Sequence, residues 1–184
     1  MNNEIKQIEQ YARKNLSDLN WFHTKGVRLI AHNLSEKEKG DKRIIDIAVL
    51  LHDIAKDKKS LLSHAQSGSS VAKKLLKELK YDKKFINQVV HCIKSHSSPW
   101  AKNGPMPKSI EAKIVFDADM VQQLSPLGIV KHILKYKNRN FQNLIILAKK
   151  DLLNINNIIL TTNGKKMAAK RIKYIKNFFN TFKF

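Results

Sequence analysis

The sequence has few of the residues that would mark a secreted, disulfide-bonded or membrane protein. Its 184 residues include a single cysteine, Cys92, which cannot build a disulfide framework. No apolar run approaches the roughly 18 residues that would span a bilayer, and the polar N-terminus lacks the apolar core of a secretory signal. These absences predict a cytoplasmic protein with no membrane segment, and the length favours one domain.

Acidic residues are also scarce. Asp and Glu number 15 against 35 Lys and Arg, which gives a formal net charge of +20 and favours non-specific attraction to nucleic acid. Few of the basic residues are Arg, whereas specific recognition uses Arg forks and clustered aromatic rings. After Asp119 the only acid is Asp151, and such a basic C-terminal third favours a small phosphorylated substrate. Whether the chain forms an oligomer stays open.

Strand-type alternation is absent as well, whereas apolar residues recur at three and four positions along most of the chain. This spacing predicts an all-α fold of eight or nine helices. Ser109 is expected to begin one helix, Ser125 with Pro126 another, and Thr162 or Asn163 the last. The helices are expected at 2–14, 19–34, 41–57, 66–80, 83–97, 109–123, 126–136, 140–160 and 164–183.

Three of the four prolines lie within residues 97–107, directly after His96. Proline without a backbone N–H breaks helices, so this stretch is expected to be an irregular loop. Two interpretations of the loop stay open: Trp100 and Lys102 lie over a ligand, or Trp100 covers the core.

Several histidines and aspartates continue apolar stripes and should therefore point inward. Residues 45–56 read as a helix that is apolar on nearly every side, yet they contain His52 and Asp53. A single buried histidine is most often a core residue held by a hydrogen bond, and a buried carboxylate needs a cation. A divalent metal would satisfy several such groups at once. The other inward residues are His23, His96 and Asp119.

These residues carry a resemblance to a known family. His23, then His52-Asp53 within Leu-Leu-His-Asp-Ile-Ala-Lys, then Asp119 within Phe-Asp-Ala-Asp-Met, resembles the H…HD…D signature of the HD superfamily of metal-dependent phosphohydrolases. The resemblance implies a single HD domain over 1–184, with a core of about 19–137 and a basic helical extension over 140–184 packed on it. Further segments are similar to small stand-alone bacterial members, at 64–72, 90–97, 111–114 and 160–171.

The resemblance also implies a ligand set for one divalent metal ion, which would be Mn, Fe, Ni, Co or Mg. Asp117 and Asp119 lie about 200° apart on a helix, so only one of them can face the metal. Periodicity does not choose between them. The resemblance assigns Asp119 and leaves Asp117 to support the ligands from behind or to a structural role. The full ligand set is His23, His52, Asp53 and Asp119.

Other histidines have different expected roles. His64 and His96 match positions that complete a second metal site in some HD proteins and contact substrate phosphate in others. His91 and His96 lie some 140° apart on a helix, so they cannot share one role; His96 is expected at the site and His91 in packing behind it. His32 and His132 match no motif and are expected to be ordinary surface or core residues.

One position departs from the pattern of the family. Its first motif often carries an Arg three residues after the His, but here Gly26 stands there and Arg28 is displaced by two. Because that Arg would help to orient a phosphate or another ligand, the resemblance leaves the substrate open. All of the metal ligands are present.

The resemblance implies hydrolysis of a phosphoester or pyrophosphate bond by a metal-activated water, with a nucleotide as the preferred substrate. Lys56 is a candidate to contact the phosphate, or else a solvated lysine at a helix end. Asp57 is a candidate to accept the proton of the water, or else a surface residue. Two alternatives remain: a two-metal hydrolase of dinucleoside polyphosphates or signalling nucleotides, and a non-catalytic HD-fold protein that binds nucleic acid or regulates.

Overall fold

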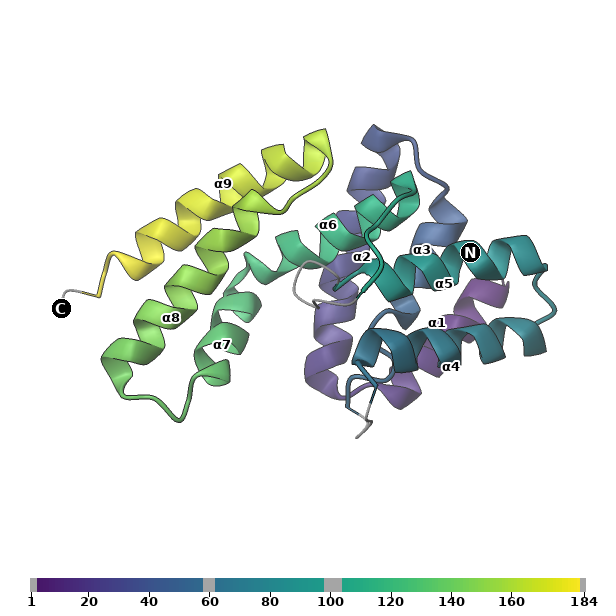
Figure 1. The fold of residues 1–184 in the computed structure, drawn as a ribbon, viewed down its shortest axis with the longest axis horizontal. Helices are drawn as coiled ribbons and strands as arrows, with labels where there is room; N and C mark the ends of the chain where they lie inside the picture. The colour runs from purple at the N-terminus through teal and green to yellow at the C-terminus, as the bar shows by residue number, and fades with distance from the viewer. Residues whose placement is uncertain (1–2, 58–61, 98–103, 183–184) are drawn as a thin grey trace.

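The structure is a computed structural model that describes residues 3–57, 62–97 and 104–182, and within these ranges all of its regular secondary structure is helical (Figure 1). The prediction of an all-α fold is confirmed. Trp100 and Lys102 lie outside the described residues. The elements are α1 (Asn3–Asn15), α2 (Asp18–Glu38), α3 (Lys42–Leu51), α4 (His64–Glu78), α5 (Lys83–Ser95), α6 (Ile110–Gln123), α7 (Pro126–Lys135), α8 (Phe141–Asn154), a 3-10 turn η1 (Ile155–Asn157) and α9 (Thr162–Phe179).

Side-chain caps explain most of the helix starts. Ser109 and Ser125 begin α6 and α7 as predicted, each accepting a hydrogen bond from a backbone N–H three residues further on. The prediction for the last helix is wrong in its cap, because Thr161 takes the place expected for Thr162 or Asn163. The Thr161 hydroxyl accepts the backbone N–H three residues on and starts α9 earlier than expected.

The difference that matters most for the site is at the end of α3. A helix was expected over 41–57, but α3 ends directly before His52, and the chain continues in turns. The backbone N–H groups of Ile54 and Lys56 donate to carbonyls three residues earlier, at 3.2 and 2.8 Å. The apolar run hid this change from the sequence pattern. His52 and Asp53 therefore lie on this turn, directly after the helix and not within it.

The helices form two groups that meet along α6 (Figure 1). In the first, α2 packs on α3 and α6, α5 packs on α3, α4 and α6, and α1 packs on α3. Helix α3 is buried along all but its first turn, from Ile44 to Leu51. In the second group α7 packs on α8 and α8 on α9. The division into a core of 19–137 and an extension of 140–184 stays a prediction. Within the described ranges, no helix is both long and apolar enough to cross a membrane.

A buried carboxylate joins the two groups. Asp117 on α6 accepts hydrogen bonds from the backbone N–H groups of Leu160 (2.8 Å) and Thr161 (2.7 Å) and from the Thr161 hydroxyl (2.6 Å). Burial raises the pKa of Asp117 in spite of these bonds. A Cβ at Gly164 would lie 2.5 Å from this carboxylate, so only glycine allows the close approach. Asp117 therefore holds the start of α9 against α6.

A second polar network ties α2 to its neighbours. Arg28 on α2 donates to both carboxylate oxygens of Asp46 on α3 (2.6 and 2.8 Å) and to Glu9 on α1 (2.9 Å). Nε2 of His32 also lies 2.7 Å from Asp46. Burial opposes ionisation of Asp46, but His32 and Arg28 hold its pKa below the usual range. Arg28 is thus engaged between helices.

Candidate metal centre and pocket

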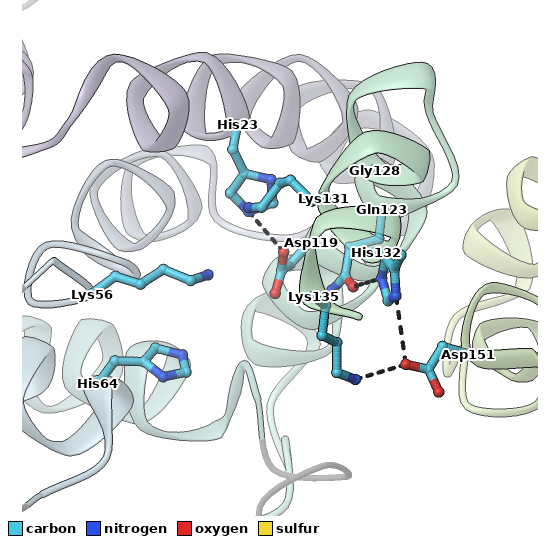
Figure 2. A pocket seen from close by; sticks show the side chains of 10 residues that line it. All are labelled: His23, Lys56, His64, Asp119, Gln123, Gly128, Lys131, His132, Lys135 and Asp151. Carbon is cyan, nitrogen blue, oxygen red and sulfur yellow. Dashed lines mark hydrogen bonds and ion pairs between the residues drawn. The ribbon is translucent and has the colours of Figure 1, made fainter. Parts of the chain in front are cut away.

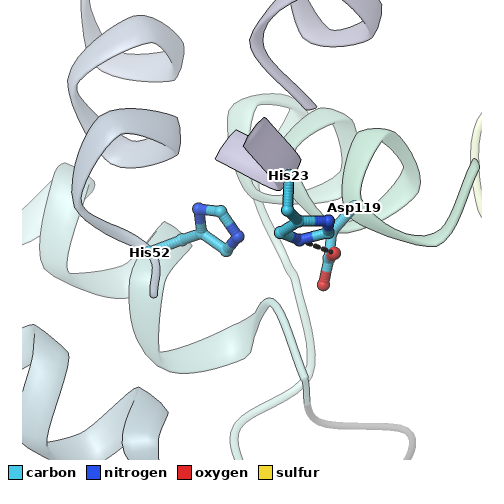
Figure 3. A group of neighbouring side chains, drawn as sticks. All are labelled: His23, His52 and Asp119. Carbon is cyan, nitrogen blue, oxygen red and sulfur yellow. Dashed lines mark ion pairs between the residues drawn. The ribbon is translucent and has the colours of Figure 1, made fainter. Parts of the chain in front are cut away.

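Side chains from three segments converge on one buried point, as Figure 3 shows for His23, His52 and Asp119. His23 comes from α2, His52 and Asp53 from the turn after α3, and Asp119 from α6. Nε2 of His23 lies 3.0 Å from Oδ1 of Asp119 and 3.7 Å from Oδ2 of Asp53. Nε2 of His52 lies 3.5 Å from the same Oδ2. Each of the four residues is at most 5% exposed.

Two more histidines approach the other oxygen of Asp53. Nε2 of His96, at the end of α5, lies 3.6 Å from Oδ1 of Asp53, and Nε2 of His64, at the start of α4, lies 3.7 Å from it. The two Nε2 atoms are 3.3 Å apart. Asp53 therefore presents Oδ2 to one pair of histidines and Oδ1 to another. Among the residues that the structure describes, two groups of three have possible ligand atoms within 4.8 Å of one another: His23, His52 and Asp119, and His52, Asp53 and His96.

Backbone carbonyls decide which ring nitrogen of two histidines faces the cluster. Nδ1 of His52 lies 2.7 Å from the carbonyl oxygen of Val49, and Nδ1 of His96 lies 2.6 Å from that of Ile93. A carbonyl only accepts, so each Nδ1 carries the hydrogen, and in a neutral ring Nε2 keeps its lone pair. Hydrogen bonds of this kind orient the histidines of metal sites.

The cluster contains buried polar atoms that have no hydrogen-bond partner within the described part of the chain. They are Nε2 of His23, Nε2 of His52 and Oδ1 of Asp53. An unsatisfied buried polar group costs about 1–3 kcal/mol, and a charged one more. Imidazole nitrogens and carboxylate oxygens are suitable donors to a divalent cation, whose charge would offset the two carboxylates. The residues present therefore fit a divalent metal ion.

The protonation states also fit a metal. Burial lowers the pKa of His52 to about 4, so its ring is neutral near pH 7. Burial opposes ionisation of Asp53 and Asp119, but the neighbouring histidines, joined at Asp53 by Lys56, hold the pKa of both carboxyls below the usual range. A neutral imidazole between ionised carboxylates has the protonation that metal binding requires.

The two predicted catalytic residues lie in different surroundings. Nζ of Lys56 donates to Oδ2 of Asp53 at 2.6 Å. Burial lowers the pKa of Lys56, but the carboxylates of Asp53 and Asp119 outweigh it and raise the pKa. Both oxygens of Asp57 accept hydrogen bonds at the start of α2, from the backbone N–H of Ser17 (3.0 Å) and the side-chain amide of Asn20 (2.7 Å). Asp57 thus anchors the turn after α3 to α2.

The two aspartates of α6 point to different partners. Asp119 lies beside His23, whereas Asp117 binds the start of α9. His91, on α5, accepts a hydrogen bond from the backbone N–H of Lys108 at 3.2 Å, which fastens the segment before α6 to α5. The structure therefore brings Asp119 to the histidine cluster and gives Asp117 and His91 contacts that hold helices and loops together.

A pocket of about 420 Å³ opens beside the cluster (Figure 2). Small-molecule sites have volumes of roughly 300–1,000 Å³, so the size suits a small ligand. One wall is formed by His23, Lys56, His64 and Asp119. The other wall comes from the end of α6 and from α7 and α8, and consists of Gln123, Gly128, Lys131, His132, Lys135 and Asp151.

The α7–α8 wall is a hydrogen-bonded network in its own right. Asp151 accepts hydrogen bonds from Nζ of Lys135 (2.7 Å) and from the hydroxyl of Tyr136 (2.6 Å). Nε2 of His132 lies 2.9 Å from Oε1 of Gln123, and its Nδ1 lies 3.7 Å from Asp151. No motif in the sequence pointed to these residues, and His132 was expected to be ordinary. Its place in the wall depends on how α7 folds back on α8.

Comparison with known proteins gives a consistent family. The HD domain family model matches residues 20–124, from α2 to the end of α6. YpgQ of Bacillus subtilis is 32% identical over 136 residues, which are 70% of this chain and 65% of YpgQ. The tRNA (cytidine(56)-2'-O)-methyltransferase of Picrophilus torridus is 25% identical over 149 residues, which are 74% of this chain and 41% of that protein. The chain spans less than two thirds of the length of these curated relatives.

Solved structures match over almost the whole chain. A predicted HD superfamily hydrolase from an uncultured Thermotogales bacterium has a TM-score of 0.71 and 26% identity, covering 96% of this chain and 90% of its own. For B. subtilis YpgQ the TM-score is 0.77 with 23% identity, covering 96% and 92%. YpgQ in complex with ADP gives 0.74 with 22% identity, covering 96% and 94%. The shared fold therefore includes α7 to α9 as well as the region matched by the family model.

Proposed function

The chain belongs to the HD domain family, and on this premise we propose that it is a metal-dependent phosphohydrolase that cleaves a phosphoester or pyrophosphate bond of a nucleotide. One observation carries the proposal: donor atoms of His23, His52 and Asp53 that have no hydrogen-bond partner in the described ranges lie together with Asp119 beside a pocket. Buried donor atoms without a hydrogen-bond partner lower the stability of the fold unless a ligand binds them.

In the proposed reaction His23, His52, Asp53 and Asp119 hold the metal. When bound, a divalent metal supplies a Lewis acid for a phosphoryl oxygen and lowers the pKa of a water molecule. Lys56 fixes Oδ2 of Asp53 at 2.6 Å and has further N–H donors for a phosphate oxygen at the pocket.

Asp57 is assigned a positioning role, because both of its oxygens accept hydrogen bonds from α2. It joins the turn that carries His52 and Asp53 to the helix that carries His23. In this proposal Asp57 keeps the two segments of the metal site in register, and it does not accept the proton of the water.

Three observations support a nucleotide as substrate. The pocket has lysines near the metal ligands, and its far wall carries Gln123, His132 and Asp151, which have the donors and acceptors that a base or a ribose needs. The volume of about 420 Å³ suits a ligand of this size. YpgQ, which shares the fold, binds ADP in one of its structures.

The arrangement around Asp53 favours a second candidate, a two-metal hydrolase of dinucleoside polyphosphates or signalling nucleotides. Oδ1 of Asp53 has no hydrogen-bond partner in the described ranges and lies within 3.7 Å of the Nε2 atoms of His64 and His96. A carboxylate with histidines at both oxygens is suited to bridge two ions. In the one-metal form, His64 and His96 would instead contact the substrate phosphate.

The test is a screen of nucleotides and generic phosphoesters with Mn, Mg, Co or Ni. Turnover is expected with at least one metal, and Asp53→Ala is expected to lose both bound metal and hydrolysis. Full activity of Asp53→Ala would overturn the assignment. An absence of turnover with every metal, together with salt-sensitive RNA binding, would instead favour a non-catalytic nucleic-acid-binding or regulatory protein, for which the net charge of +20 is suited.

A further inference from the structure

Lys131 differs from the other lysines of the pocket in having no counter-ion. Three lysines line the pocket. Lys56 pairs with Asp53 at 2.6 Å, and Lys135 pairs with Asp151 at 2.7 Å. Lys131 makes neither a hydrogen bond nor an ion pair within the described ranges of the chain. Among the lysines that the structure describes at the pocket, its ammonium group is therefore the one whose charge is left for a ligand.

The surroundings of Lys131 make this unpaired charge unfavourable. Burial and, after it, the nearby ammonium of Lys56 lower the pKa of Lys131, and together they outweigh the carboxylates of Asp53, Asp119 and Asp57, which raise it. The side chain extends from α7 toward the wall that carries His23 (Figure 2). A half-buried cation near a second cation is stabilised when an anion enters between them. A phosphate between α7 and the metal ligands would be such an anion.

We propose that Lys131 is a substrate-binding residue whose ammonium group donates to a phosphate oxygen of a nucleotide held between the metal ligands and α7. This inference rests on the proposed function and adds to it the residue that binds the phosphate from the opposite wall. The ammonium is a point charge with three donors, which suits a phosphate of variable orientation. Helix α7 then contributes directly to recognition.

The position of Lys131 on α7 supports this assignment. Lys131 and Lys135 are four residues apart on one helix, so they share a face, and that face lines the pocket. The ion pair with Asp151 neutralises Lys135 and holds it at the α8 side. In Figure 2 the side chain of Lys131 lies toward His23, whereas that of Lys135 lies toward Asp151.

The experiment compares binding of ADP, inorganic pyrophosphate and adenosine by calorimetry, and hydrolysis by kcat and KM, in wild type, Lys131→Met and Lys131→Arg. Loss of one charge-assisted hydrogen bond is expected to weaken binding of ADP and pyrophosphate roughly 10- to 100-fold. KM is expected to rise more than kcat falls. Adenosine, which has no phosphate, is expected to bind Lys131→Met as it binds wild type. Lys131→Arg keeps the charge and is expected to restore most of the affinity.

Lys137→Ala is the matched control, because Lys137 is exposed just beyond α7 and does not line the pocket. It removes one positive charge nearby and is expected to leave affinity and KM unchanged. An equal loss in Lys137→Ala would assign the effect to net charge and overturn the proposal. If Lys131→Met does not fold, Lys131→Gln takes its place, and equal affinities of Lys131→Gln and Lys131→Arg would equally contradict it.

The outcomes separate this inference from the proposed function. Wild-type affinity of Lys131→Met for ADP and pyrophosphate would overturn the role of Lys131 and leave metal-dependent hydrolysis standing. Loss of bound metal in Lys131→Met, measured by elemental analysis, would overturn it in favour of a role in the metal centre. If wild type binds neither phosphate compound with metal present, both proposals fail.

Discussion

The two walls of the pocket have opposite electrostatic needs. The α2–α6 wall is the one that carries His23, His52, Asp53 and Asp119. Its two carboxylates are buried, and in the described part of the chain Nε2 of His23 and Nε2 of His52 have no hydrogen-bond partner, so this wall needs a cation. On the α7–α8 wall, Asp151 is satisfied by Lys135 and Tyr136, while Lys131 has no ion pair in the described ranges. That wall needs an anion. A metal ion and a phosphate bound together would satisfy both.

The walls also come from different parts of the chain. The HD family model ends at residue 124, directly after α6, so the α2–α6 wall lies within it and α7 and α8 lie beyond it. The proposed metal ligands thus belong to the region that the family model matches. The α7–α8 wall, in the proposal made above, contributes the binding of the substrate.

Changing the two aspartates of α6 one at a time tests whether the metal site and the support of α9 are separate functions of this helix. Asp119→Asn removes a charge from the metal wall, and we expect it to lose bound metal and to lower kcat/KM by roughly 10³-fold, because a catalytic metal is worth several kcal/mol. Asp117→Asn leaves that wall intact but replaces an oxygen that accepts hydrogen bonds from Thr161. We expect it to lower the free energy of unfolding by about 2 kcal/mol and to keep its metal.

Elemental analysis, kinetics and chemical denaturation of the two variants give the measurement, with each variant serving as the control of the other. If Asp117→Asn loses metal while it is still folded, Asp117 also supports the metal site, and the two aspartates of α6 do not have separate roles. Retention of metal by Asp119→Asn would remove Asp119 from the ligand set.

The residues of the α2–α6 wall could be predicted from the sequence better than those of the α7–α8 wall, for a physical reason. The inward direction of His23, His52 and Asp119 follows from helical periodicity, since each continues an apolar stripe. The end of α3 could not be predicted, because the apolar pattern resumes at Ile54 and Ala55, beyond the point where the helix stops. The tautomers of the histidines depend on the carbonyls to which their Nδ1 atoms donate, and these are invisible in a motif.

The second wall has no local signature at all. Lys131 and His132 line the pocket only because α7 folds back so that they face His23 and Asp119 across it. The same holds for the cap of α9. Thr161 caps this helix in place of Thr162 because the hydroxyl and the backbone N–H of Thr161 both donate to Asp117. Contacts between distant segments decide these positions, and spacing along the chain carries little information about them.

A second prediction concerns the support behind the metal wall. Arg28→Ala leaves the buried carboxylate of Asp46 without its bidentate partner, and we expect the free energy of unfolding to fall by roughly 3 kcal/mol. Metal content and kcat of the folded protein are expected to stay close to wild type. Arg13→Ala is the control, because the Arg13–Asp18 pair is exposed and such pairs contribute about 0–1 kcal/mol. Equal losses of unfolding free energy in the two variants would show that burial of the Arg28 network contributes nothing to stability.

Metal addition tests whether the cation acts on one wall only. Mn²⁺ at about 100 times its dissociation constant is expected to raise the free energy of unfolding by about 2.7 kcal/mol, and chelation to reverse the change. Hydrogen exchange is expected to slow in α2, the turn after α3 and α6, while α8 changes little. If hydrogen exchange slows in α8 as much as in α2 and α6, the metal stabilises both walls.

The number of ions per chain sharpens the same measurement. One ion by elemental analysis favours the one-metal enzyme, and His64→Ala is then expected to keep it while KM rises. Two ions in wild type, falling to one in His64→Ala or His96→Ala, would favour the two-metal alternative. In that case His64 at the start of α4 and His96 at the end of α5 would be metal ligands as well.

The smallest effect is expected at the α7–α8 wall. Tyr136→Phe removes the hydroxyl that donates to Asp151 at 2.6 Å, and because Lys135 still pairs with Asp151 we expect a loss of about 1 kcal/mol or less in unfolding free energy. Tyr174→Phe, at a half-exposed tyrosine of α9, is the control and is expected to change nothing. Metal content should be unaffected in both, since neither touches the α2–α6 wall. If Tyr136→Phe raises KM for a nucleotide but leaves pyrophosphate binding unchanged, the Asp151 network contacts the nucleoside. If Tyr136→Phe instead releases metal, the α7–α8 wall also supports the metal site, and the description of two independent walls is wrong.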